Sequence, residues 1–391
     1  MTKLFLRLRR FCCFAFGIVF FFSGLIKLMD PVGAGLVVKE YFDFLHIGFM
    51  APASKVFGVT LALAETLVGA AMACGVWRRI VGVIAIIMQS AFTLITLALL
   101  IFNPEMDCGC FGEAIHLTHL QTFIKNLILL ALVIIYFLPN RHLGIRRKKN
   151  FVSFGLVSIS AIAFMIYSLL YIPLINFTAY KPGAELLVAS TQGGDDIYEA
   201  IFTYQKDGKK KDFRLDELPD STWTFISTET RLKEGIKENT IELSIFDPKI
   251  QSHVDTIAAK GKVIVISVYD PDLSGNVWKE VEMMARNSED CGFKAILLTT
   301  ESEAIPATLQ DITYTSDYKT LVSLNRSNGG ATYFCDGTLI KKWARRSLPS
   351  VEELKDAFTD DPTEISISYE SKGSLVFQGF LCFLISILLL I

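Results

Sequence analysis

Long apolar runs dominate the first half of the chain, and they predict membrane-spanning helices. A bilayer core about 30 Å thick needs about 20 largely apolar residues per helix. Six runs reach or approach this length, at residues 11–29, 56–76, 80–102, 120–138, 152–174 and 375–391. We therefore predict six transmembrane helices, with the lipid bilayer as an obligatory partner.

The first run has two interpretations. Arg7, Arg9 and Arg10 precede it, as basic residues precede the apolar core of a cleaved signal peptide. However, the run ends in Lys27, Leu28, Met29 and Asp30, without the small residues of a cleavage site. We therefore expect a retained helix.

The distribution of Lys and Arg predicts the orientation, because basic residues near helix ends stay on the cytoplasmic side. One set of helix ends carries three clusters, Arg7 to Arg10, Arg78 to Arg79 and Arg141 to Lys149. The other set carries only Lys39 and Lys55 before the second helix, and residues 103–119 carry no Lys or Arg. We expect a multi-pass protein of the bacterial cytoplasmic (inner) membrane. The loop around Cys108 and residues 176–374 would then be periplasmic.

Composition agrees with a membrane protein and excludes one other class. The mean hydropathy of +0.42 is too high for a soluble protein of 391 residues. The formal net charge is -2, and no long basic run lies outside the clusters that flank the apolar runs. Nucleic acid is therefore not an expected partner.

The polar half of the chain predicts two extracytoplasmic units. In residues 176–255, alternating stretches at 197–204 and 211–215 flank Lys206, Asp207 and Gly208, a hairpin turn signal. This predicts a small β-rich subdomain. In residues 261–358, the pattern predicts a strand, a helix, a second strand, a second helix and a hairpin, at 263–268, 277–286, 293–299, 319–325 and 332–343.

That order of elements resembles a thioredoxin fold, but the residues that carry thioredoxin chemistry are missing. After the first strand this chain has Tyr269 to Gly275 where the family has Cys-x-x-Cys, and Ala331 precedes Thr332 where the family has a cis proline. We predict a degenerate domain with a docking or structural role. Cys291 and Cys335 are either a disulfide pair or two separate thiols.

Cys108 and Cys110, separated by Gly109, form a candidate redox pair in the loop after the third helix. Glycine allows the tight turn that would join two sulfurs at this spacing, and the resulting ring would be strained. Strained disulfides exchange readily, which favours thiol chemistry over a structural role. The alternative is two cysteines that are unpaired or paired elsewhere.

Glu65 is the most conspicuous ionisable residue inside an apolar run, where a charge costs about 2.5 to 3.5 kcal/mol. It needs a proton or a partner. Lys27 is one candidate, although helix rise places the two residues about 10 Å apart in depth. Water or Gln89 would then lie between them. Alternatively, Lys27 and Lys125 favour the thiolate form of the cysteine pair. The two proposals compete for Lys27.

His116 and His119 follow the cysteines at a spacing that resembles a Cys2His2 zinc set. An exported loop in an oxidising compartment favours a disulfide over zinc-bound thiolates. The two histidines also suit the start of an interfacial helix. We therefore predict no metal site.

Four segments resemble the DoxX and MauE superfamily of four-helix membrane proteins, namely Phe22 to Pro31, Ala64 to Gly69, Asp107 to Gly112 and Gln121 to Asn126. The resemblance covers residues 11–138 and implies a redox-associated membrane domain over residues 1–145. It implies a link with methylamine utilisation, where the MauE branch supports disulfide formation in a periplasmic dehydrogenase subunit. A fifth helix at 152–174, the soluble units and the helix at 375–391 extend this unit. The whole architecture is similar to that of proteins from Bacteroidetes-type bacteria.

Three functional hypotheses follow. In the first, Cys108 and Cys110 exchange disulfides with an exported thiol-containing or redox protein, supported by Glu65, Lys27 and Lys125. No bound cofactor is predicted, and a quinone or another carrier takes the electrons. In the second, the protein is a non-enzymatic scaffold whose degenerate domain docks a periplasmic client. In the third, it is a small-molecule transporter that uses Glu65.

Overall fold

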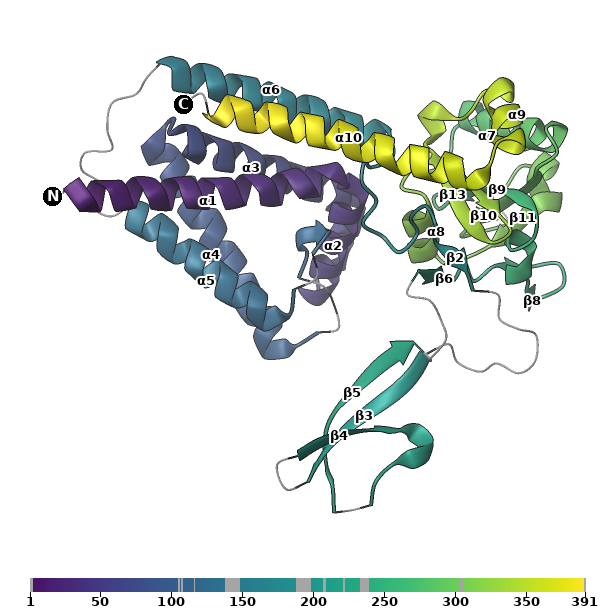
Figure 1. Ribbon diagram of the computed structural model, residues 1–391, viewed down its shortest axis with the longest axis horizontal. Coiled ribbons are helices and arrows are strands. Elements are labelled where there is room, and N and C mark those ends of the chain that lie inside the picture. Colours follow the sequence, from purple (N-terminus) through teal and green to yellow (C-terminus); the bar gives the residue numbers. More distant parts are fainter. Residues whose placement is uncertain are drawn as a thin grey trace.

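A computed structural model describes residues 3–104, 106, 108–115, 117–137, 148–187, 198–206, 209–220, 222–232, 239–302 and 305–389. Figure 1 shows a helical bundle at one end and a sheet domain at the other. The bundle contains α1 (Lys3–Met29), α2 (Pro31–Phe44), the short helix η1 (Gly48–Ala53), α3 (Ser54–Cys74), α4 (Arg78–Phe102), α5 (His119–Phe137) and α6 (Lys148–Leu170).

Within the described residues, five segments are long and apolar enough to cross a membrane, Arg7–Met29, Gly48–Cys74, Arg78–Phe102, His119–Phe137 and Lys148–Leu170. They confirm the first five predicted helices to within a few residues, apart from the extension of the second span through η1. Helix α10 (Pro362–Leu389) lies beside α6 (Figure 1) but is not among these five. Residues 390 and 391 lie outside the described residues, so the sixth span stays a prediction.

Helices α1 and α3 form the tightest pair in the bundle. A Cβ atom at Gly69 would collide with the backbone of Phe21, so glycine is what allows this close approach. Phe16, Phe21 and Leu25 are fully buried along α1. Helix α1 is therefore part of the core of the bundle, and its retention after export stays a prediction.

Helix α2 was not predicted from the apolar pattern, because it is short and crosses no bilayer. Asp30 caps its start by accepting a hydrogen bond from Gly33 N at 2.9 Å, and Pro31 occupies its first turn. The helix lies at the end of the bundle nearest the sheet domain (Figure 1).

The sheet domain is built around four strands whose order was predicted. Strands β9 (Lys262–Val268) and β10 (Lys294–Thr299) are parallel, while β12 (Gly330–Cys335) pairs antiparallel with β9 and with β13 (Thr338–Trp343). Helices α7 (Gly275–Asp290) and α9 (Val351–Thr359) cover one face, and α8 (Tyr318–Leu324) covers the other. Alternating residues of β9 face the two layers, as in a sheet buried on both sides.

Further short strands extend this sheet, and four of them come from outside the predicted unit of 261–358. Five join it, namely β2 (Glu185–Leu186), β6 (Thr240–Ile241), β7 (Phe246–Asp247), β8 (Ser252–His253) and β11 (Thr313–Thr315). The sheet order is β6-β2-β13-β12-β9-β10-β11-β7-β8. Residues 176–255 therefore contribute to two sheets, because four of these strands belong to the larger one.

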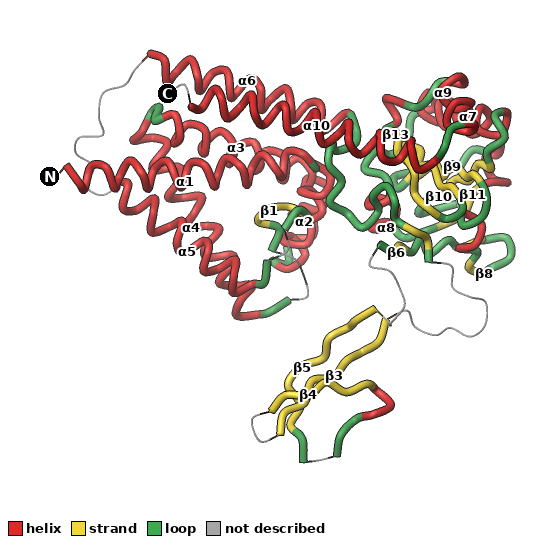
Figure 2. Tube along the Cα trace, in the orientation of Figure 1, coloured by secondary structure: helices red, strands yellow, loops and turns green. Residues whose placement is uncertain are grey.

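The predicted hairpin forms a sheet of its own (Figure 2). Strand β3 (Tyr198–Lys206) pairs with β4 (Lys209–Arg214) and with an unpredicted third strand, β5 (Thr224–Leu232). The turn residues 207 and 208 lie outside the described residues. The last described pair before them is Lys206 opposite Lys209.

Candidate functional site

The cysteine loop begins at Asn103, directly after α4, and folds back against α2. Gly109 has a φ of 55°, and a Cβ atom there would collide with the side chain of Val37. The position therefore requires glycine for both conformation and space. Tyr41 of α2 donates a hydrogen bond from its hydroxyl group to the backbone oxygen of Cys108, at 2.6 Å. Helix α2 thus supports the loop that carries both cysteines.

Cys108 is buried and contacts a histidine. Its Sγ lies 3.0 Å from Nδ1 of His119, and Nε2 of the same ring lies 3.1 Å from the backbone oxygen of Pro104. A carbonyl oxygen only accepts hydrogen bonds, so a neutral His119 carries its proton on Nε2. Nδ1 is then the acceptor, positioned to take the proton of the Cys108 thiol. Cysteine, histidine and an orienting third group form the arrangement that activates thiol nucleophiles.

Cys110 is half-buried and opens the short strand β1 (Cys110–Glu113). Its backbone oxygen lies 2.8 Å from Oγ of Ser23 on α1, which also lies 3.1 Å from Oε2 of Glu65. The hydroxyl group has a single hydrogen, which serves one of these two acceptors at a time. Ser23 therefore links the cysteine loop to the buried carboxylate.

Glu65 pairs directly with Lys27. The Nζ of Lys27 lies 2.7 Å from Oε1 and 2.8 Å from Oε2 of Glu65, whose side chain is only 1% exposed. The structure therefore confirms the pair of Lys27 and Glu65 but not a group between them. Gln89 instead donates to the backbone oxygen of Asn126 at 3.0 Å. Two charges buried together neutralise each other, and removing one of them leaves the other uncompensated.

Lys125 occupies a different position from Lys27. Its Nζ lies 4.7 Å from the ring centroid of Phe111, the residue after Cys110, in a cation–π contact. Of the two lysines considered as electrostatic support for the thiols, Lys27 is therefore engaged by Glu65, whereas Lys125 contacts the ring of the residue next to Cys110.

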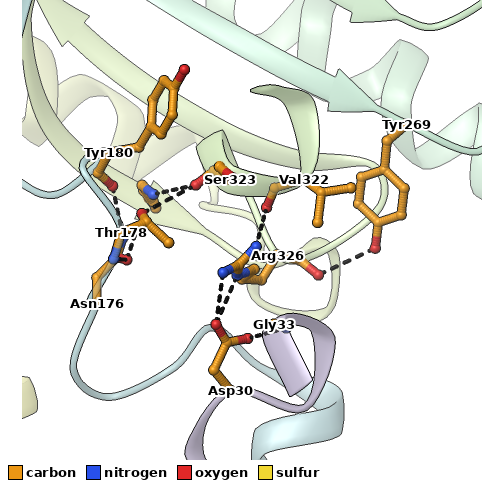
Figure 3. Close-up of polar contacts among 10 residues, drawn as sticks. Asp30, Gly33, Asn176, Thr178, Tyr180, Tyr269, Val322, Ser323 and Arg326 are labelled. Atoms are coloured by element: carbon orange, nitrogen blue, oxygen red, sulfur yellow. Dashed lines mark hydrogen bonds and ion pairs between the residues drawn. The ribbon is translucent and has the colours of Figure 1, made fainter. Parts of the chain in front are cut away.

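The sheet domain contacts α2 through a second buried ion pair, shown in Figure 3. Nη2 and Nε of Arg326 lie 2.8 and 3.0 Å from Oδ2 of Asp30, and both side chains are largely buried. A more exposed pair joins Lys319 to Glu40 at 2.9 Å. The Asp30 carboxylate both caps α2 and binds the sheet domain, so one side chain couples helix geometry to domain contact.

The segment after β9 makes contacts of a different kind. Burial raises the pKa of Tyr269 to about 12, so the hydroxyl stays protonated and donates to the backbone oxygen of Arg326 at 3.2 Å (Figure 3). Asp270 N donates to Asn328 Oδ1 at 3.2 Å, and Asn328 Nδ2 donates to Asp270 O at 2.6 Å. These bonds hold the segment against the loop that carries Arg326.

The other cysteines and histidines bear on two further expectations. No disulfide joins Cys291 to Cys335, and the Cys291 thiol instead donates to the backbone oxygen of Val351 at 3.7 Å. Among the described residues no cluster of three His, Cys, Asp or Glu side chains fits a metal ion. His116 and Asp107 lie outside the described residues.

Sequence reasoning missed several residues of the site. It weighed His119 as a metal ligand or helix start, whereas the structure places it against Cys108. It also gave no role to Ser23, Tyr41 or Arg326. The capping sequence Asp30-Pro31 would have indicated α2, and the position of His119 at the first turn of α5 would have indicated an imidazole near the loop.

Comparison with known families matches two parts of the chain. Residues 4–139 match the model of a family described as Methylamine utilisation protein MauE. Residues 198–237 match a family described as a domain of unknown function (DUF8463). No curated protein and no solved structure matches. The membrane region is therefore MauE-like. The matched segment runs from α1 to α5 and includes the cysteine loop between α4 and α5.

Proposed function

We propose that this protein exchanges disulfides with an exported protein through Cys108 and Cys110. The observation that carries the proposal is the contact of 3.0 Å between Cys108 Sγ and His119 Nδ1, with His119 oriented by Pro104. A histidine so oriented can both remove a proton from a thiol and return one to a departing thiolate.

The unequal burial of the two cysteines assigns them different roles. Cys110 is half-buried, while Cys108 is only 4% exposed. In the oxidised loop, a partner thiol gives its proton to His119, and the resulting thiolate attacks Cys110 Sγ and breaks the intramolecular disulfide. Cys108 leaves as a thiolate and takes a proton from the imidazolium of His119. A second partner thiolate then attacks the mixed disulfide and releases Cys110, which takes up a proton. The partner gains a disulfide, and the loop becomes a dithiol.

The ion pair of Lys27 and Glu65 would support this chemistry structurally. Through Ser23 it fixes the backbone of Cys110. Lys125 would add positive potential beside Phe111, which favours thiolates.

The topology supports an exported partner. In the sequence, the basic clusters flank the helix ends opposite those next to the cysteine loop and the sheet domain, so the loop would face the periplasm. The sheet domain would be thioredoxin-like, because β9, α7, β10, α8, β12, β13 and α9 follow that order and pairing. The name of the matched family adds methylamine utilisation as a metabolic setting. An exported enzyme of that pathway would be a natural recipient of disulfides.

The test uses the full chain in lipid nanodiscs, with the loop oxidised beforehand, and a reduced peptide that contains two cysteines. We expect one peptide disulfide per protein. Cys108→Ser with Cys110→Ser should produce none, and Cys291→Ser with Cys335→Ser serves as the matched control with full yield. Equal yields from both double variants would refute the proposal and favour the scaffold hypothesis.

A further inference from the structure

The bundle contains a cavity of about 360 Å³ next to the cysteine loop. Residues of α1 to α5 line it, together with both Cys108 and Cys110. Most of its walls are apolar, with aromatic rings from Phe20, Phe57 and Phe92. Its volume lies in the range of small-molecule sites, which are mostly apolar with a few placed polar groups.

The polar groups of this cavity include one without a partner. Gln89 is fully buried, and its Nε2 donates to the backbone oxygen of Asn126. Among the described residues, Oε1 of the same amide has no hydrogen-bond partner, although Gln89 lines the cavity. Leaving such an acceptor buried and unsatisfied costs free energy. A ligand that donates a hydroxyl group at this position would recover that cost.

Cations face the same space. Lys27 and Lys125 both line the cavity, and each ammonium group also contacts an aromatic ring, Phe92 at 5.7 Å and Phe111 at 4.7 Å. An ammonium group can donate to a ligand carbonyl. The cavity therefore offers donors, one unsatisfied acceptor and aromatic walls beside two thiols.

We propose that this cavity binds the headgroup of a membrane quinone, which accepts electrons from Cys108 and Cys110. The ligand must be lipid-soluble, because the cavity lies within the membrane-spanning bundle. It must also accept two electrons and two protons, because that is what a dithiol releases on closing a disulfide. A quinone carbonyl accepts from lysine, and the hydroxyl group of the resulting quinol donates to Gln89 Oε1.

The reaction balances without a further reactant. His119 takes the proton of Cys108, and the Cys110 thiol releases a second proton. The two sulfurs form one bond and give up two electrons. The quinone takes both electrons and two protons and becomes a quinol. The redox step of this inference rests on the proposed function. Quinone binding does not, because it requires only the cavity and its polar groups.

Binding is therefore measured first, in the variant with Cys108→Ser and Cys110→Ser, using decylubiquinone as the probe in nanodiscs. We expect saturable binding that weakens about tenfold with Gln89→Met, the loss of one hydrogen bond. Asn150→Leu is the matched control, because Asn150 on α6 also carries a buried amide oxygen without a partner but does not line the cavity. It should bind as the parent does.

The protein with both cysteines should then convert decylubiquinone to its quinol, one for each disulfide formed. Absent binding, with peptide oxidation intact, would overturn this inference and leave the proposed function standing. Equal competition by decanol would show an acyl-chain site and overturn it as well. Bound quinone that never yields quinol, although the loop is a dithiol, would refute the quinone as electron acceptor. Failure of peptide oxidation with normal quinone reduction would count against the proposed partner instead.

Discussion

Two segments of this chain follow an apolar element and lead towards a helix, yet they are built differently. The cysteine loop after α4 brings two thiols next to His119, with the pair of Lys27 and Glu65 beneath it. The segment after β9 has no thiol, and its polar groups bond to the neighbouring loop around Asn328. The first arrangement suits the proton transfer that we propose, while the second holds its segment against the loop that carries Arg326, which binds Asp30 at the start of α2. In our proposal, chemistry and docking are therefore separated along the chain.

The largest expected effect comes from breaking the ion pair beneath the cysteine loop. Glu65→Leu leaves the Lys27 ammonium buried without its partner and should lower the free energy of unfolding by about 3–5 kcal/mol. Unfolding in detergent, followed by tryptophan fluorescence, measures this. Lys27→Met combined with Glu65→Leu removes both charges and should recover most of the loss. A double variant as unstable as Glu65→Leu alone would show that the charge is not the cause.

Removing the base next to Cys108 should have the next largest effect. His119→Ala should slow oxidation of the peptide by about 10²-fold, the low end of what a positioned base contributes. The deficit should shrink at alkaline pH, where a thiol ionises without a base. His253→Ala, on exposed strand β8, is the control and should leave the rate unchanged. A rate unaffected by His119→Ala at neutral pH would contradict the assignment of His119.

Breaking the ion pair between Arg326 and Asp30 should weaken the contact between the sheet domain and the bundle more than it slows the chemistry of the cysteine loop. Arg326→Ala removes charged hydrogen bonds to Asp30 and should weaken the docked state by about 1.5–3 kcal/mol. Limited proteolysis should then cut faster between bundle and sheet domain. Because Tyr41 on α2 still supports the loop, peptide oxidation should fall less than tenfold. A complete loss of oxidation would mean that docking and chemistry are not separate.

The exposed contact between the same two parts should matter least. Lys319→Ala removes the pair with Glu40, in which the Lys319 side chain is 75% exposed, and such pairs contribute about 0–1 kcal/mol. The proteolysis assay used for Arg326→Ala should show little change. A loss as large as that of Arg326→Ala would contradict the ranking by burial.

Much of the fold could be predicted because its signals are local. A run of about 20 apolar residues predicts a membrane-spanning helix whatever the helix packs against. The central strands of the sheet domain are continuous apolar segments, which also stand out in the sequence. Short elements such as β2 and β7 carry no comparable signal, because two residues cannot show a period. Their places depend on the neighbouring strands, so the boundaries of the domain could not be read from the sequence.

The site was predicted only in part, for a related reason. Cys108, Cys110 and Glu65 stand out by type and position alone. Depth along separate helices placed Lys27 and Glu65 about 10 Å apart, whereas close packing of α1 on α3 brings their side chains into contact. His119 is separated from Cys108 by a loop whose path no pattern specifies, and its contact with the thiol emerges only from the fold.

The central claim is that Cys108 and Cys110 change redox state together, and alkylation trapping in intact membranes tests it most directly. Membranes are treated with reductant or oxidant, the thiols are blocked with a maleimide of known mass, and both cysteines are read by mass spectrometry. We predict that both react after reduction, Cys110 faster than the more buried Cys108, and that neither reacts after oxidation. A single unchanging state of the two cysteines under both treatments would contradict the account.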